Sequence, residues 1–156
     1  MLRDQKASDA YSTFVRGVEP GLRRALTAGF GLDVGREAAA EALGYGWRNW
    51  DRVQQMSNPS GYLFRVGQSA ARRLVKPDRS PVHASVAVYD EPWVEPGLEA
   101  AWSSLSERQR TVAGLVHGYG WSLSEVADLL GISKSAVQIH ERRAMKKLRR
   151  DLGVRR

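Results

Sequence analysis

The sequence predicts an all-α protein made of two small helical domains joined by a proline-rich acidic linker, the second domain being a helix-turn-helix. Three observations support this fold class. Apolar residues recur at three- and four-residue spacing through most of the chain, which is typical of amphipathic helices. A stretch without that periodicity, residues 77–98, separates residues 1–76 from residues 99–156. Two capping-box patterns and a short glycine turn then follow in the second part.

The composition excludes several classes of protein. With 156 residues, 42% of them hydrophobic, the chain has room for one domain or two small helical cores. It has no cysteine, which excludes disulfides and thiolate metal sites and fits a reducing cytoplasm. No apolar run approaches the roughly 18 residues of a membrane span, and the amino terminus starts no run of signal-peptide length. We expect a soluble cytoplasmic protein that does not associate with membranes.

The first domain begins with an amphipathic helical segment over residues 9–28, which Pro20 should bend or divide. The glycines in residues 29–31 end this segment. Asp33 is placed to cap a second helix, which continues to Trp50.

Two faces of this second helix differ in chemistry. Glu37 and Glu41 are four residues apart and share one face, whereas Trp47 and Trp50 are three apart and share another. From residue type alone, we expect the tryptophans in the core and the glutamates in solvent.

A polar loop, residues 51–58, precedes a third helix that begins at Pro59. Its apolar side holds Tyr62, Leu63, Val66 and Ala70. Its other side could face nucleic acid, because arginine and small hydrogen-bonding side chains bind phosphate and base edges, although a plain solvent face explains it nearly as well. That side carries Arg65, Gln68, Ser69, Arg72 and Arg73.

The linker, residues 77–98, holds four of the six prolines and more acidic than basic residues. Loops longer than about 12 to 15 residues are uncommon inside one compact domain. We therefore expect two domains that are able to reorient.

The second domain carries the clearest local signals. Ser106 to Gln109 and Ser122 to Glu125 are capping boxes, and Gly118 can end the helix that follows the first one. The helix that begins after Ser122 should stop at Gly131, and Ser133 can cap the next. So short a turn makes the two helices cross steeply, which is the unit that places its second helix in the DNA major groove. One shared core is expected from Leu105, Val112, Leu115, Val126, Leu130, Ile132, Val137 and Leu148.

The net charge of +7 is confined to one part of the chain. Residues 133–156 hold nine Lys or Arg against two acidic residues, while the other 132 residues hold fifteen of each sign. A basic run alone is more often a solvated helix face, but after a helix-turn-helix it favours contact with DNA phosphates.

On the second helix of this motif, Val137, Ala144 and Leu148 should face the core. Glu141 falls along the same seam, where an unpaired carboxylate would be costly. The opposite side should face DNA, with Gln138 suited to adenine, Ile139 to a thymine methyl, and the basic residues to phosphate. These DNA-facing residues are Lys134, Ser135, Gln138, Ile139, Arg142, Arg143 and Lys146.

No sequence pattern supports an enzyme, a metal or a cofactor. His83, His117 and His140 are scattered without partners at metal-ligand spacing, and His140 is expected to be a half-buried packing residue. Residues 131–135 resemble the end of a phosphate-binding loop but lack its first glycine and a preceding strand. There is also no nucleophile paired with a base.

With these motifs in place, the chain resembles the bacterial sigma-70 family, specifically its extracytoplasmic-function (ECF) type, which retains only regions two and four. The most specific segments are residues 105–110 and 121–137, which resemble region four, the family's reader of the minus-thirty-five promoter element. LuxR-type regulators share this helix-turn-helix pattern. The resemblance makes residues 99–156 a region four and residues 1–76 a region two.

The resemblance also implies roles in region two. Glu37, Glu41 and Trp47 fall on its RNA polymerase-binding helix. Residues 59–66 resemble the segment before the minus-ten DNA-reading face, so Asn58, Arg65, Gln68, Arg72 and Arg73 would contact that element, and residues 51–58 would help capture an unstacked base.

The implied function is a sigma factor that binds core RNA polymerase and promoter DNA, with an anti-sigma factor as a further partner. The alternative is a sigma-like DNA-binding regulator that does not productively bind polymerase. The alternative is motivated by Ala38-Ala39-Ala40, which stands where the family has larger residues.

Overall fold

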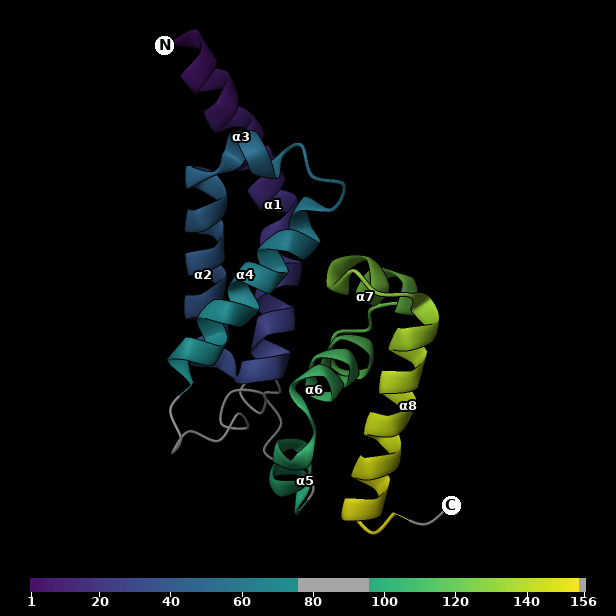
Figure 1. The fold of residues 1–156 in the computed structure, drawn as a ribbon. Helices are drawn as coiled ribbons and strands as arrows, with labels where there is room; N and C mark the ends of the chain where they lie inside the picture. The colour runs from purple at the N-terminus through teal and green to yellow at the C-terminus, as the bar shows by residue number, and fades with distance from the viewer. Residues whose placement is uncertain (76–95, 155–156) are drawn as a thin grey trace.

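The computed structural model describes residues 1–75 and 96–154, and within these residues the chain is helical without any strand. Figure 1 shows α1, α2 and α4 lying side by side, with α6, α7 and α8 packed along one flank. The predicted all-α fold class is confirmed. The elements are α1 (Leu2–Phe30), α2 (Leu32–Arg48), α3 (Trp50–Val53), α4 (Pro59–Leu74), α5 (Leu98–Ser104), α6 (Glu107–Ala113), the π-helical turn η2 (Gly114–Gly118), α7 (Leu123–Leu130) and α8 (Lys134–Asp151).

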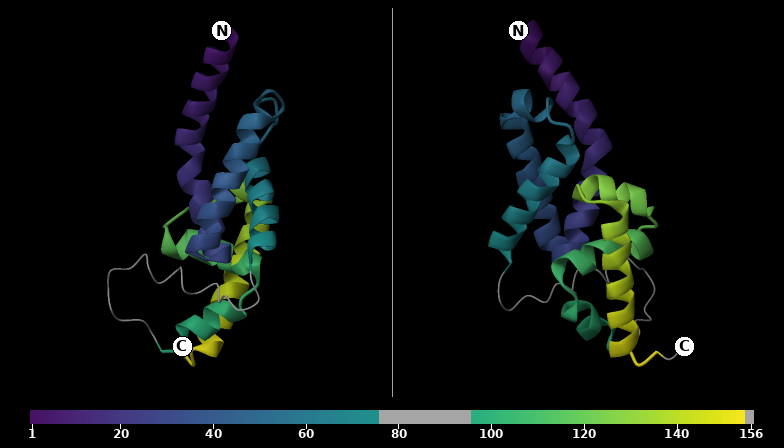
Figure 2. Two further views of the ribbon diagram at one scale, coloured as in Figure 1. Left: turned by 90° about the vertical axis from the view of Figure 1, so that its left-hand side faces the viewer. Right: turned by 45° about the vertical axis from the view of Figure 1, so that its right-hand side comes forward.

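Helix α1 is a single helix of 29 residues, so the expectation that Pro20 could divide it is wrong. Proline removes one backbone hydrogen bond. That loss is local, and buried residues on both sides of it, Tyr11 before and Leu22 and Leu26 after, hold α1 against its neighbours. The first turns of α1 carry no buried residue and extend beyond the other helices (Figure 2).

The starts of α2 and α4 are set by different devices. Helix α2 begins at Leu32, directly after Gly31, whose φ of 94° suits glycine. Asp33, expected to be the cap, lies in the first turn instead and makes no cap bond. Helix α4 begins at Pro59, as predicted, and the side chain of Asn58 caps it by accepting the N–H of Gly61 at 3.0 Å.

Both capping boxes predicted in the second half are present, at Ser106 with Gln109 and at Ser122 with Glu125. Gly118 does not directly end α6. Helix α6 passes at Gly114 into η2, a wider π-helical turn that ends at Gly118.

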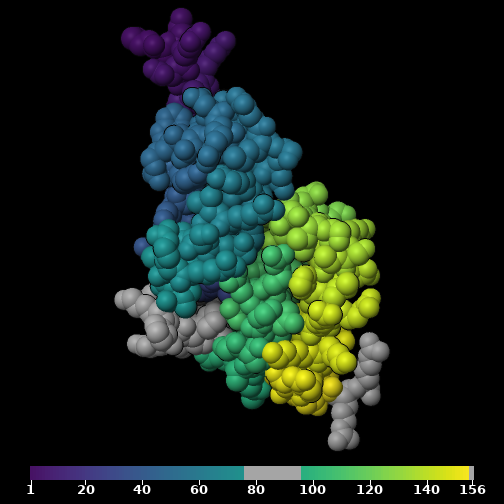
Figure 3. Space-filling view, in the orientation of Figure 1, coloured from purple at the N-terminus to yellow at the C-terminus, as the bar shows by residue number. Residues whose placement is uncertain are grey.

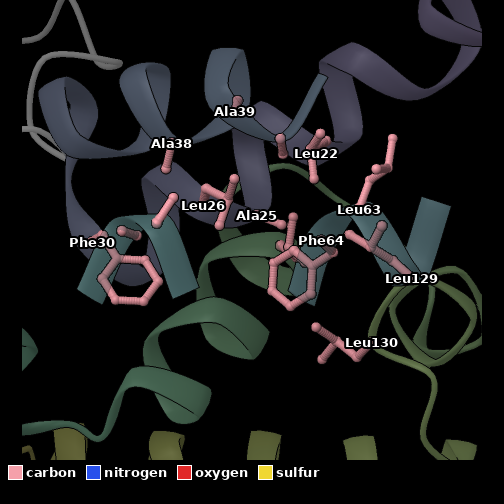
Figure 4. Packing of buried hydrophobic residues seen from close by; sticks show 14 of the residues in the cluster. Leu22, Ala25, Leu26, Phe30, Ala38, Ala39, Leu63, Phe64, Leu129 and Leu130 are labelled. Carbon is pink, nitrogen blue, oxygen red and sulfur yellow. The ribbon is translucent and has the colours of Figure 1, made fainter. Parts of the chain in front are cut away.

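The buried core does not follow the predicted one. Val112, Leu115, Val126, Leu130 and Val137 join a cluster that includes residues of α1, α2 and α4, and Ile132 is only partly buried against it. Figure 4 shows this cluster, with Phe64 of α4 on the side of Leu129 and Leu130 of α7.

The two other residues of the predicted second-half core, Leu105 and Leu148, lie in a separate small cluster with three alanines. The single C-terminal core is therefore wrong. Periodicity identifies which faces are apolar, but it does not identify which helix covers them.

The predicted linker, residues 77–98, lies outside the described residues except for its last three, and α5 begins at Leu98. The described residues on either side of it pack closely together (Figure 3). The division of the chain into residues 1–76 and 99–156 remains a prediction.

Candidate nucleic-acid interface

The connection between α7 and α8 is a three-residue turn. Gly131 adopts the left-handed conformation with φ 67°, and the backbone N–H groups of Gly131 and Ile132 both bond to the carbonyl of Ala127. Ser133 then caps α8, accepting the N–H of Ala136 at 3.0 Å. The predicted stop and start of these helices are confirmed.

Helix α8 divides into two faces as the sequence predicts. Val137, Ala144 and Leu148 are buried. Ile139 is 44% exposed, so its apolar side chain is open to a partner on this face. The other predicted DNA-facing residues are also exposed, namely Lys134, Ser135, Gln138, Arg142, Arg143 and Lys146.

The Glu141 side chain is partly exposed and reaches across to η2. Its carboxylate lies 2.9 Å from Nε2 of His117, at the end of η2. This contact ties the middle of α8 to η2. His140 is half-buried, as predicted, and its burial and two neighbouring arginines lower its pKa.

The polar side of α4 lies against the second half of the chain. Asn58 donates from Nδ2 to the carbonyl of Asp128 at 2.6 Å. Glu107 accepts from Gln68 at 3.1 Å and from two nitrogens of Arg72 at 3.1 and 3.0 Å. Glu107 raises the pKa of Arg72, as expected for a cation held by a carboxylate.

The remaining predicted residues of this side differ in exposure. Gln68 is buried, 9% exposed, contrary to the expected open face. Arg65 is exposed beside the α7–α8 turn, where a Cβ on Gly131 would come within 2.8 Å of its guanidinium. Arg73 turns away and pairs with Glu41 of α2.

On α2, Glu37 and Glu41 are exposed as predicted. Trp47 is 48% exposed, so its expected burial is wrong, whereas Trp50 is buried. One side of the Trp47 ring rests against Tyr11, at a centroid distance of 5.3 Å, and the rest faces solvent. Of the three consecutive alanines, Ala38 and Ala39 are buried in the core and only Ala40 is at the surface.

Sequence reasoning missed two groups of polar residues. Glu107 was read only as part of a helix start, yet it holds two residues of α4. Arg52 donates to the hydroxyls of Tyr45 and Tyr62, which also bond to each other at 3.1 Å, and so joins α2, α3 and α4. The spacing of these residues follows no motif, so only the fold brings them together.

Most of the second half is similar to a known family. The family model described as "Sigma-70, region 4" matches residues 101–150. These residues are similar to sigma-70 region 4. The match includes α6, η2, α7 and nearly all of α8, so the sequence-based resemblance is confirmed for this part of the chain. Ser133, Gln138 and Ile139 lie within the matched residues, at the start of α8.

Among solved structures, the fold is similar to that of the sigma factor RpoE from Bartonella quintana, determined in complex with the anti-sigma factor NepR. The sequence identity is 21%, the match covers 94% of this chain and 99% of that one, and the TM-score is 0.59. The likeness is one of fold, and it includes helices before residues 101–150 as well as those within them. No curated protein matches the sequence.

Within the described residues, no helix is long and apolar enough to cross a membrane. Residues 1–75 and 96–154 also hold no group of three or more His, Asp or Glu side chains placed to bind a metal ion.

Proposed function

We propose that the chain is a sigma factor of the ECF type, which binds core RNA polymerase and directs it to a promoter. The observation that carries the proposal is a sigma-70 region 4 whose second helix presents an exposed polar and basic face. We do not expect a sigma factor to be an enzyme. Because it would act on polymerase and DNA, we propose that the chain functions in the cytoplasm.

Different residues on the exposed face of α8 are proposed to contact bases and phosphates of the minus-thirty-five element. Gln138 can pair with adenine through its amide, and Ile139 can touch a thymine methyl group. Arg142, Arg143 and Lys146 supply phosphate contacts, with Lys134 and Ser135 at the start of the helix. Since the excess positive charge of the chain lies in residues 133–156, affinity should fall steeply with salt.

Gln138→Ala should relax base preference, costing about 1 to 3 kcal/mol at one base pair. The preference is measured by selection from a random duplex library with the wild type and the variant. Arg143→Ala is the matched control on the same helix, and it should weaken binding to all sequences and reduce the salt dependence. Equal weakening of every sequence by Gln138→Ala would refute its assignment to a base.

The outward face of α2 is proposed to contact polymerase. Glu37 and Glu41 supply exposed carboxylates, and Trp47 supplies an aromatic ring with nearly half its surface free. Exposed aromatic residues flanked by charge are typical of protein interfaces. Between the two glutamates, the exposed Ala40 contributes only a small methyl group to this face.

A pull-down with purified core polymerase, followed by run-off transcription, tests this role. We expect core binding that is lost in Trp47→Ala and retained in Arg16→Ala, an exposed change on α1. DNA binding without core binding would instead establish the alternative, a sigma-like regulator. The exposed Ala40 favours that alternative, whereas the burial of Ala38 and Ala39 removes most of its basis.

The minus-ten role proposed for α4 is supported by its concentration of arginine and amide side chains. Arg65, Arg72 and Arg73 are exposed. The amide nitrogens of Asn58 and Gln68 donate to Asp128 and Glu107 of the second half. Cationic and amide groups on one helix suit the phosphates and base edges of melted DNA.

An anti-sigma factor is the further proposed partner, since the similar RpoE structure contains one. Addition of such a partner to the reconstituted transcription reaction should suppress run-off product. Unchanged transcription in the presence of a bound partner would refute this role.

A further inference from the structure

A pocket of about 280 Å³ lies where α1, α2, α4 and α6 meet. Figure 1 shows the end of α1, the start of α2 and the end of α4 at the same end of these three helices, with α6 beside them. Of the residues with a proposed role in DNA or polymerase binding, only Arg72 lines this pocket. A ligand here would therefore serve a purpose beyond the proposed function.

Part of the pocket lining is apolar. Phe30 at the end of α1 and Val34 in the first turn of α2 are only 8% and 6% exposed, and both line the pocket. Val75, at the end of α4, also lines it and is 43% exposed. Since contact with a hydrocarbon or aromatic group would remove this surface from water, these side chains favour a ligand with an apolar body.

The rest of the lining carries an excess of positive charge. Arg72 and Arg110 contribute two guanidinium groups, and Glu107 contributes one carboxylate. The two Glu107 oxygens already accept hydrogen bonds from Arg72, at 3.1 and 3.0 Å, and from Gln68, at 3.1 Å. The single excess positive charge favours a monoanion over a neutral molecule or a cation.

Both guanidinium groups also have N–H donors to offer. Arg110 uses Nε and Nη1 for the carbonyls of Gly29 and Leu105, and Arg72 uses Nε and Nη2 for Glu107. Among the described residues, Nη2 of Arg110 and Nη1 of Arg72 have no hydrogen-bond partner. Burial lowers the pKa of Arg110, so its charge is only partly compensated and a nearby anion would stabilise it.

The volume limits the size of the ligand. At about 30 Å³ for each water molecule, the pocket holds the equivalent of about nine waters, which leaves room for a molecule of roughly ten non-hydrogen atoms. A nucleotide is too large for this space. An inorganic anion would leave the apolar lining in contact with water.

We propose that the pocket binds a small organic carboxylate, with its charged group at the two arginines and its apolar body against Phe30, Val34 and Val75. Arginine suits this group because its planar N–H donors match the two carboxylate oxygens. The bound molecule would contact α1, α2, α4 and α6 together, and it would therefore stabilise the folded chain.

Nuclear magnetic resonance of the full chain, labelled with ¹⁵N, tests the binding. The probes are benzoate, its neutral analogue benzamide, its cationic analogue benzamidine, and acetate, which has the charge but no apolar body. The arginine Nε–H resonances are assigned with Arg72→Lys and Arg110→Lys. We expect saturable shifts of both resonances with benzoate, about tenfold weaker binding of benzamide and acetate, and no shifts with benzamidine.

A charge at the pocket tests the location. Val75→Glu places a carboxylate beside the two arginines and should weaken benzoate binding about tenfold, because like charges placed together repel. Val154→Glu is the matched control, since Val154 is 55% exposed and lies beyond the end of α8. It should change the affinity less than about twofold. Circular dichroism checks that both variants keep their helices.

Thermal unfolding gives a second measurement. At ten times its dissociation constant, benzoate should raise the unfolding midpoint of the wild type and of Val154→Glu by about 3 to 6 °C. The rise should be smaller in Val75→Glu, where less of the chain is occupied.

Four results would overturn the site. Equal affinity for benzoate and benzamide would remove the role of the charge, and equal affinity for benzoate and acetate would remove the role of the apolar lining. Unchanged binding in Val75→Glu would place the ligand elsewhere. Shifts confined to the arginines of α8 would mean an adventitious ion only, bound to the basic helix.

The outcome is separate from that of the sigma factor proposal. Promoter-dependent transcription without benzoate binding would leave the proposed function intact and overturn this pocket. Benzoate binding in a chain that binds neither polymerase nor promoter DNA would have the opposite meaning.

Discussion

Replacing Arg110 should destabilise the junction between α1 and α6. The Arg110 guanidinium is half-buried, and it donates from Nε to the Gly29 carbonyl at 2.9 Å and from Nη1 to the Leu105 carbonyl. The last turn of α1 has no basic residue of its own, so Arg110 supplies from another helix the cation that favours a helix carboxyl end.

The magnitude follows from these two bonds. Hydrogen bonds to charged groups contribute about 1.5 to 3 kcal/mol each, which gives roughly 3 to 6 kcal/mol for the pair. Burial opposes the charge, since desolvation lowers the pKa of Arg110 despite the nearby Glu107, and fixing the long side chain costs up to about 2 kcal/mol. A net loss of about 2 to 4 kcal/mol is expected for Arg110→Ala.

Urea unfolding followed by circular dichroism and tryptophan fluorescence measures this loss. Arg110→Lys should lose about half as much, because a lysine ammonium reaches one carbonyl but lacks the fork that reaches both. Arg108→Ala, two residues earlier on α6 and without a hydrogen bond or ion pair in the described residues, is the matched control and should change stability by less than about 0.5 kcal/mol. Equal effects of Arg110→Ala and Arg108→Ala would refute the reasoning.

Three further predictions concern α8 and the turn before it. Glu141→Ala should cost less than about 1 kcal/mol in thermal unfolding, since its contact with His117 is partly exposed, and a loss above 2 kcal/mol would contradict this. Burial lowers the pKa of His140 below its usual 6.5, so the unfolded chain takes up the proton at a higher pH than the folded chain, and stability should be lost as pH falls from about 6.5. Denaturant titrations across pH should show this slope for the wild type and not for His140→Gln. A slope of opposite sign would be inconsistent with a lowered pKa. Gly131→Ala should lower the free energy of unfolding, measured in urea, by about 1 kcal/mol or more. The φ of Gly131 is 67°, and the new methyl group would meet Arg65. An unchanged free energy of unfolding would refute this strain.

The helix boundaries that the sequence predicted best are those determined by local chemistry. Ser106, Ser122 and Ser133 each cap a helix as expected, and Gly131 ends α7, because a cap needs only residues within one turn. The buried face of α8 was predicted for the same reason, since helical spacing alone groups its apolar residues.

What the sequence could not determine is which surfaces meet. Trp47 was expected in the core from its residue type, yet only one side of its ring packs against another residue, Tyr11. Gln68 was expected at an open face, and it is buried because Glu107, 39 residues away, lies over it. Such outcomes depend on pairs of residues distant in sequence, and periodicity carries no information about those pairs.

The small residues of α1 show how sequence and packing together determine the contact between α1 and the second half. Read along the sequence, Gly21 and Gly29 only weaken a helix. In the fold, a Cβ at Gly21 would collide with the ring of Trp121 at 2.7 Å, and one at Gly29 with Thr111. The same helix buries Leu22 and Leu26 in the cluster shared with α2 and α4. Because α1 packs against both halves, its glycines facing Trp121 and Thr111 permit an approach that larger residues would prevent.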